Sequence, residues 1–212
     1  TSSAWVGYYW ARARGYFDSV EYIGNATSGH TVTHNLGVAP EMMWIKRKVG
    51  AVNWAIYYGD NTDKMSFNTD GGGNDQIAFW NDTSPTASVF TLGDDNDVNA
   101  DDYDFIALLF ATVAGVSKVG TFTQSGATNV DCGFTGDTPS FILIKRTDST
   151  GSWYVVDSAR GIIAGNDPYL LLDSTAAHTT NTDLVDPYSG GFATTSSLAN
   201  GDYFFYAIAA IS

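Results

Sequence analysis

The chain of 212 residues lacks several features on which whole classes of protein depend. It has a single cysteine, Cys132, so an intrachain disulfide and a cluster of thiolate metal ligands are both excluded. It has no apolar run of about eighteen residues or more, which predicts no membrane insertion. Its first residues form neither a basic nor a continuous apolar segment, so no secretory signal is expected. The sequence predicts a soluble fold that is stabilised by packing.

Good helix formers and positive charges are also scarce. Glutamate occurs only at Glu21 and Glu41, and glutamine only at Gln76 and Gln124, although exposed helical faces normally draw on both residue types. The formal net charge of −13 repels phosphate backbones, so nucleic acid is not an expected partner. Aromatic residues reach 14%, and turn-forming Gly, Asp, Asn and Ser are abundant. This mixture favours short strands joined by tight turns.

The most informative feature is an internal repeat with a period of about 100 residues. Residues 40–47 match residues 139–146, with Pro, Ile, Lys and Arg at identical spacing, and residues 102–107 match residues 202–207. The repeat predicts an all-β fold made of two tandem antiparallel β-sandwich repeats. The expected division is a lead-in segment or strand at 1–18, a first repeat at 19–115 and a second at 116–212. A short connection predicts that the repeats pack side by side as a rigid pair.

Both repeats are expected to contain the same succession of strands, with a hairpin between the third and the fourth. The last strand of each repeat is apolar on both faces, which predicts a central strand that is buried on both sides. A buried helix over residues 105–111 is the alternative, because periodicity does not separate the two in a short apolar run. The expected strands are 19–23, 30–34, 42–48, 54–58 and 103–113, then 119–123, 128–132, 141–147, 153–157 and 203–211.

Several segments resemble a known family. The stretch His-Thr-Val-Thr-His-Asn-Leu-Gly at 30–37, followed by Pro40, is similar to a motif of phage tail-fibre modules. A longer pattern resembles an uncharacterised tandem-repeat domain of marine phage and cyanophage tail-fibre and virion structural proteins. The resemblance runs from about Trp10 to the end of the chain, and it implies a virion role without established catalytic residues. The residues of the longer pattern are Trp10, 17–18, 22–25, 40–42, 144–151 and Trp153.

Tryptophans are the first candidates for a binding site, since a planar ring beside Asp or Asn can stack on a sugar. Trp54 and Trp153 recur with the hairpin and are expected to be architectural. For Trp44, core packing is the alternative to sugar stacking. Trp80 stands alone in a loop-like stretch, so Trp80, Asn81 and Asp82 are the predicted ligand-binding residues. Recognition is expected to vary in the loops that differ between the repeats, which are residues 68–86 and 159–167.

The sequence contains no complete metal site, and no cofactor is predicted. Residues Asp95, Asp97, Asn99 and Asp101 alternate as in a calcium loop, but they lack the glycine and the final glutamate of the helix-loop-helix version. A solvated turn is the competing interpretation. His30 and His34 share one strand face, although no third ligand accompanies them. The expected role of a histidine at this strand end is to bond the backbone of the glycine corner that follows.

Two other sets of reactive side chains have structural interpretations. Cys132 lies in a strand-like run and is expected to be a small buried apolar residue rather than a nucleophile. The basic residues at 46–48 and 145–146 recur with the third strand, so pairing with turn aspartates is expected rather than an anion site.

These features lead to two main hypotheses. The first is a non-enzymatic, homotrimeric tail-fibre or receptor-binding module on the virion surface, with loops that bind a host surface glycan or protein. The second is a purely structural virion component, such as a fibre shaft, an adaptor or a capsid decoration, that contacts only other phage virion subunits. A third, an oligosaccharide-cleaving enzyme, is disfavoured because the sequence indicates no pair of carboxylates at a defined separation.

Overall fold

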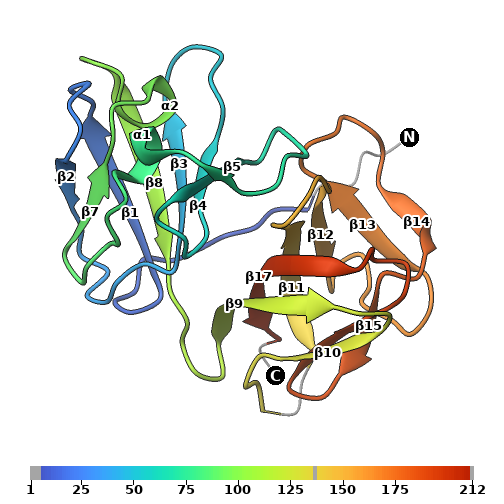
Figure 1. Cartoon of the computed structure of the whole chain (residues 1–212). Helices are drawn as coiled ribbons and strands as arrows, with labels where there is room; N and C mark the ends of the chain where they lie inside the picture. Colours follow the sequence, from blue (N-terminus) through green and yellow to red (C-terminus); the bar gives the residue numbers. More distant parts are fainter. Residues whose placement is uncertain (1–5, 136–137, 211–212) are drawn as a thin grey trace.

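Each half of the chain forms a sandwich of one large and one small β-sheet (Figure 1). The computed structural model describes residues 6–135 and 138–210. The first half contains β1 (Phe17–Ile23), β2 (His30–Thr33), β3 (Met42–Arg47), β4 (Ala55–Tyr57), β5 (Asp63–Ser66), β6 (Asn74–Asp75), α1 (Ile77–Trp80), β7 (Val89–Leu92), α2 (Asn96–Asn99) and β8 (Asp104–Phe110). The second half contains β9 (Ser117–Gln124), β10 (Thr128–Asp131), β11 (Pro139–Arg146), β12 (Trp153–Asp157), β13 (Asp167–Leu171), β14 (Thr179–Thr182), β15 (Val185–Tyr188), β16 (Gly191–Thr194) and β17 (Gly201–Ala209).

The two halves share one strand order. The large sheet of the first half runs β1-β8-β3-β4-β5-β6, and that of the second half runs β9-β17-β11-β12-β13-β14 when it is followed from its β9 edge. The small sheets are β2-β7 and β10-β16-β15, so β15 is the one strand of the described residues that has no counterpart in the other half. The named strand pairs are antiparallel. The prediction of an all-β fold with two tandem sandwich repeats is confirmed.

Both halves begin with the same turn, slightly before the boundaries that the sequence indicated. Ala13 pairs with Phe17 in the first half, and Val113 pairs with Ser117 in the second. Gly15 and Gly115 occupy matching places in these turns, with φ of 80° and 72°, a left-handed conformation that favours glycine. Residues 17–18, expected to belong to the lead-in, therefore open β1, and residues 6–12 contain no strand.

The last strand of each half lies inside its large sheet, as predicted. β8 lies between β1 and β3, and β17 lies between β11 and β9. In β8, Phe105 and Leu109 face the core of the first sandwich, whereas Phe110 packs on the opposite face of the sheet. Because both faces are covered, both sets of side chains are apolar. The helix alternative for residues 105–111 is wrong.

A third core joins the two sandwiches along a boundary that we call the seam. Each sandwich has its own core, and the outer faces of the two large sheets pack against each other at the seam. This packing docks the two short-linked repeats against each other as a pair. The buried residues of the shared core are Phe17, Met42, Trp44, Ile56, Met65, Phe67 and Phe110 from the first half, and Val119, Phe141, Leu143, Trp153, Val155, Phe204 and Tyr206 from the second.

Residues 6–12 cross the seam as a strap (Figure 1). The Tyr8 hydroxyl donates a hydrogen bond to Asp157 Oδ2 at 2.5 Å and accepts one from Arg160 Nη2 at 2.9 Å. Burial, and then the bond to Asp157, raise the pKa of Tyr8 well above its ordinary value. Trp10 packs edge-on against Trp44 of the first half, with ring centroids 5.7 Å apart. The strap thus contacts both sandwiches.

In the described part of the chain, no helix has the length and apolarity that crossing a membrane requires.

Candidate functional site

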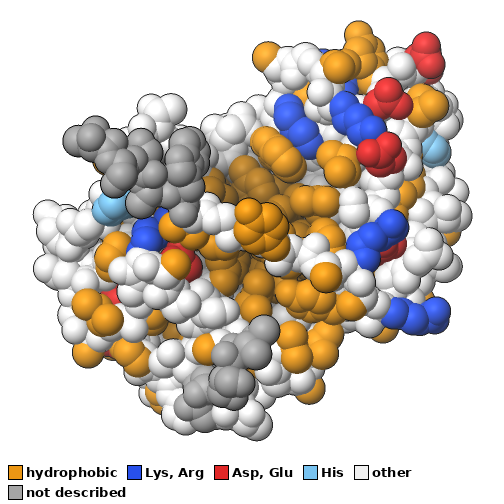
Figure 2. Space-filling model, turned by 180° about the vertical axis from the view of Figure 1, so that it is seen from behind, with side chains coloured by type: hydrophobic (Ala, Val, Ile, Leu, Met, Phe, Trp, Pro, Cys, Tyr) orange, Lys and Arg blue, Asp and Glu red, His pale blue; other side chains and the backbone are white. Residues whose placement is uncertain are grey.

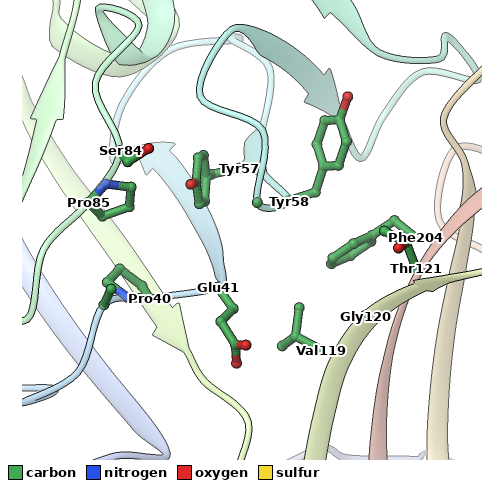
Figure 3. A pocket seen from close by; sticks show the side chains of 12 residues that line it. Pro40, Glu41, Tyr57, Tyr58, Ser84, Pro85, Val119, Gly120, Thr121 and Phe204 are labelled. Carbon is green, nitrogen blue, oxygen red and sulfur yellow. The ribbon is translucent and has the colours of Figure 1, made fainter. Parts of the chain in front are cut away.

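A cleft with a volume of about 380 Å³ opens where the two halves meet (Figure 3). We call it the inter-repeat cleft. The first half contributes the residues just before β3, the end of β4 and the loop before β7, and the second half contributes β9 and β17. Its principal lining residues are Pro40, Glu41, Tyr57, Tyr58, Ser84 and Pro85 from the first half, and Val119, Gly120, Thr121 and Phe204 from the second.

Tyr58 is the aromatic side chain most open to the cleft. Its ring is half-buried and meets the ring of Phe204 across the seam, at 5.9 Å between centroids and 67° between planes. Its hydroxyl donates to Asp63 Oδ2 at 2.7 Å, which fixes the orientation of the ring. Burial and this hydrogen bond raise the pKa of Tyr58, so the phenol stays neutral at physiological pH. Tyr58 therefore presents a positioned, uncharged ring face.

A second hollow of about 480 Å³ extends the cleft outward. It shares Tyr58, Gly59 and Thr121 with the inner part and adds Asp60 and Asn61. Both volumes lie in the range of roughly 300–1,000 Å³ that is common for small-molecule sites. The two hollows adjoin at Tyr58, Gly59 and Thr121, and we call them together the groove.

The charge of the groove is negative. Among the described residues that line either part there is no Lys or Arg, whereas Glu41 lines the inner part and Asp60 the outer part. Asp60 Oδ1 accepts from the hydroxyl and the backbone N–H of Thr62, at 2.7 and 2.9 Å. These bonds lower the pKa of Asp60, so its carboxyl group is ionised at neutral pH.

Strand β9 brings backbone groups to the same groove, because it is the edge of its sheet. The hydroxyl of Thr112 accepts from the N–H of Val119 at 3.1 Å and lies 3.5 Å from the Val119 carbonyl oxygen, so it caps this part of the edge. Thr121, two residues further on, is exposed and lines both parts of the groove. Beyond the capped Val119, the Thr121 hydroxyl can offer a hydrogen bond to a bound molecule.

Comparison with known proteins places the chain in a family. A family model described as a domain of unknown function (DUF7483) matches residues 6–211. The chain belongs to this family. No curated protein and no solved structure matches the chain. The match covers the strap and both sandwiches, so the DUF7483 unit is the docked pair. Its description names no function, and the resemblance to phage tail-fibre modules stays a prediction.

The DUF7483 fold does not expose Trp80, and the prediction that this ring is an open contact is wrong. Trp80 is 1% exposed, and its Nε1 donates to the carbonyl of Asp63 at 2.8 Å. The apolar turn α1 inserts it into the first core, where it packs edge-on against Tyr57 behind the cleft wall. Asn81 and Asp82 follow α1 at the surface, in left-handed conformations and without an adjacent open ring.

The calcium loop that the sequence suggested is also contradicted. Asp95 accepts from the N–H of Asp97 at 2.8 Å and begins α2, and Asp97 accepts from Asn53 Nδ2 at 2.9 Å. Asn99 is fully buried and donates to the Gly93 carbonyl at 2.7 Å. Asp101, the fourth predicted ligand, is exposed at the surface. These side chains do not converge, and the described residues of the DUF7483 domain include no group of three or more His, Cys, Asp and Glu that could hold a metal.

The histidine and cysteine interpretations agree with the structure. His34 is buried, and its Nδ1 accepts from the N–H of Leu36 in the glycine corner at 3.3 Å, while Nε2 lies 3.2 Å from the Thr86 carbonyl oxygen. Burial lowers the pKa of His34. His30 bonds Asn99 Oδ1 through its Nδ1 at 2.9 Å. Cys132 is buried, which raises the pKa of its thiol to about 12.

The recurring basic residues differ in their partners: Arg47 lies over the Tyr103 ring, and Lys48 forms an ion pair with Glu21. Arg146 forms an ion pair with Asp148 at 2.6 Å, so pairing with a turn aspartate is confirmed there. The two equivalent lysines, Lys46 and Lys145, instead donate to backbone carbonyls of their own hairpin loops. The prediction of aspartate pairing is wrong for these lysines.

Sequence reasoning missed the cleft, because its walls come from both repeats. One signal was available at the end of β4. Tyr57 and Tyr58 stand there, and the aligned positions of the second repeat hold Val156 and Asp157. The two repeats are otherwise similar here, so an aromatic pair that is present in one repeat alone indicates a position where the two halves have different roles.

Proposed function

We propose that this chain is a non-enzymatic attachment module on the surface of a phage virion, of the tail-fibre or receptor-binding kind, and that it binds a host surface glycan in the inter-repeat cleft. The observation that carries the proposal is the Tyr58 ring, held by Asp63 in a groove whose two walls belong to different repeats. The family resemblance of the sequence supports the virion setting.

The chemistry of the groove suits a saccharide. A ring face covers the apolar C–H side of a sugar, while neighbouring hydroxyl, amide and carboxylate groups bond its hydroxyls. Tyr58 supplies the ring, and Ser84, Thr121 and Asn61 supply uncharged polar groups along the groove. The shared core keeps the walls in place, so little ordering is needed when a ligand binds.

The acidic residues of the groove are better suited to binding a glycan than to hydrolysing it. A glycosidase needs one carboxylic acid with a raised pKa as well as an ionised partner. Asp60 has its pKa lowered, and Glu41 accepts a hydrogen bond from the N–H of Thr112. Asp60 is therefore suited to accept hydrogen bonds rather than to donate a proton to a leaving group.

The test is binding of fluorescent protein to a panel of marine bacteria and to their isolated surface polysaccharides. Tyr58→Ala is expected to lower binding by about tenfold or more, the effect of losing one good contact. Tyr58→Phe keeps the ring but loses the hydrogen bond to Asp63, so it is expected to bind more weakly than the wild type and more tightly than Tyr58→Ala. Tyr9→Ala is the control, because Tyr9 is 94% exposed on the strap and does not line the cleft. Equal binding by all variants would contradict the proposal.

The alternative, a purely structural virion component, is favoured by a different surface. Figure 2 shows hydrophobic side chains gathered in a hollow between the two halves. On the strap, Tyr9 and Val6 are exposed by 94% and 40%. An apolar surface of this kind suits a neighbouring virion subunit. Failure to bind cells, together with tight association with a purified virion subunit, would support this function instead. Light scattering tests the proposed homotrimer, and a stable monomer would contradict it.

A further inference from the structure

The two carboxylates of the groove, those of Glu41 and Asp60, carry charges that no described side chain neutralises. Glu41 and Asp60 take part in none of the ion pairs of the described residues, which join Arg12 to Asp18, Lys48 to Glu21, Arg146 to Asp148 and Arg160 to Asp157. Since apolar walls around a groove focus the field of its charges, the potential inside is negative. The formal net charge of −13 adds to it.

The positions of these carboxylates along the groove matter as much as their charge. Glu41 lines the inner part and Asp60 the outer part, and Tyr58, Gly59 and Thr121 lie on the wall that the two parts share. A chain of sugars that occupies both hollows and lies on Tyr58 therefore passes the residues Glu41 and Asp60. Carboxylates only accept hydrogen bonds, so they pair well with sugar hydroxyls and repel a carboxylate, sulfate or phosphate on the ligand.

We infer that the inter-repeat cleft selects a neutral oligosaccharide, bound along Tyr58 between Glu41 and Asp60, and rejects anionic glycans. This inference rests on the proposed function and narrows it to one ligand class. It also predicts that the host receptor is an uncharged stretch of surface polysaccharide.

The test is an array of glycans printed as matched pairs, in which each neutral oligosaccharide stands beside its uronic acid, sulfated or phosphorylated counterpart. The wild-type protein is expected to bind neutral members about tenfold more tightly than their anionic counterparts at low salt. The preference should shrink at about 0.5 M salt, where charges are screened within a few ångströms.

Two variants assign the preference to the cleft. The double variant Glu41→Gln with Asp60→Asn keeps side chains of the same size that still accept hydrogen bonds, and it is expected to gain several-fold affinity for the anionic members. The control is Asp82→Asn, which removes one exposed charge outside the cleft and is expected to leave the preference unchanged.

The outcomes separate the two proposals. Tight binding of anionic glycans that Tyr58→Ala abolishes would overturn the ligand class while it supports a glycan site in the cleft. Binding of neutral glycans that is insensitive to Tyr58→Ala would place the site elsewhere and overturn the inference. No binding to any glycan on the array or to any cell would overturn the inference and the proposed function together.

Discussion

Trp54 and Trp153 hold the same position in the two repeats but have different surroundings. Trp153 is fully buried in the shared core, and its Nε1 donates to the Ser66 carbonyl of the other half at 2.9 Å. Trp54 is only half-buried at the margin of that core. Residues that recur in the sequence thus identify the scaffold that the repeats share. At the seam, however, equivalent residues of the two repeats make different contacts.

The hairpin loops show the same inequality. The loop between β11 and β12 receives residues 70–73 of the first half: the N–H of Gly151 donates to the Asp70 carbonyl, and the N–H of Gly73 donates to the Thr147 carbonyl, both at 2.8 Å. Lys145 Nζ also donates to the Asp70 carbonyl, at 2.9 Å. Part of the loop at 68–86, expected to serve recognition, is therefore committed to docking within the chain. Repeats that dock face to face need not stay alike where they touch.

The largest expected effect comes from removing the tryptophan at the seam. Trp153→Ala leaves a cavity in the shared core and removes the hydrogen bond of the indole to the Ser66 carbonyl, so it should lower the free energy of unfolding by about 4 kcal/mol. Trp54→Ala, the matched variant, should cost about half as much or less, because that ring is already partly exposed. Urea unfolding of both proteins measures the difference. Equal losses would show that the two positions are equivalent after all.

The next effect tests the close approach of the two backbones. A Cβ at Gly72 would lie 2.6 Å from the Ser149 carbonyl oxygen and 2.7 Å from that of Thr147, both in the second half. Gly72→Ala should therefore cost about 3 kcal/mol, at the upper end of overpacking penalties. Gly71→Ala is the control, since its nearest contact is Thr69 Oγ1 at 3.9 Å. Thermal unfolding that does not distinguish the two variants would contradict the docking.

A pH-dependent effect is expected from Lys145. Burial lowers the pKa of Lys145 from 10.5 to about 8. Between these values the unfolded chain binds more protons than the folded chain, so this group's contribution to stability rises with pH. From pH 7.5 to 9.5 the wild type should gain about 2 kcal/mol relative to Lys145→Met, which has no amine to titrate. If the free energy of unfolding changed equally with pH in both proteins over this range, the lowered pKa of Lys145 would be contradicted.

The smallest expected effects compare the arginines that follow these lysines. Arg146 pairs with Asp148, whereas Arg47 lies over the ring of Tyr103, 4.4 Å from its centroid. Both contacts are near the surface, so Arg146→Ala and Arg47→Ala should each cost less than about 1 kcal/mol. Only the Arg146→Ala loss should shrink at about 0.5 M salt, because salt screens an exposed ion pair. A salt effect of the same size in both variants would remove the distinction.

Much of the fold could be predicted because the strongest signals are local. Pro40 lies just before β3 and Pro139 begins the equivalent β11, and the apolar residues of β8 occupy both of its faces, as a central strand requires. The start of each repeat was missed, because the turns at Gly15 and Gly115 share little besides glycine. Strand β15 was missed as well, since it has no counterpart in the first half.

The candidate site was harder to predict, because it depends on docking rather than on local pattern. Tyr58 and Thr121 line one groove, although they lie in different sandwiches. Trp80 misled the sequence reasoning for a related reason. Its polar neighbours Asn81 and Asp82 indicated a loop, but one helical turn before them turns the indole into the first core.

The path of the strap has a mechanical consequence. Tyr8 is anchored on Asp157 and Arg160, and β17, the last described strand, lies inside the large sheet of the same sandwich. Tension applied through these two segments enters and leaves by the second sandwich. A load carried by the hydrogen bonds of Tyr8 therefore falls first on the second sandwich, which supplies one wall of the groove.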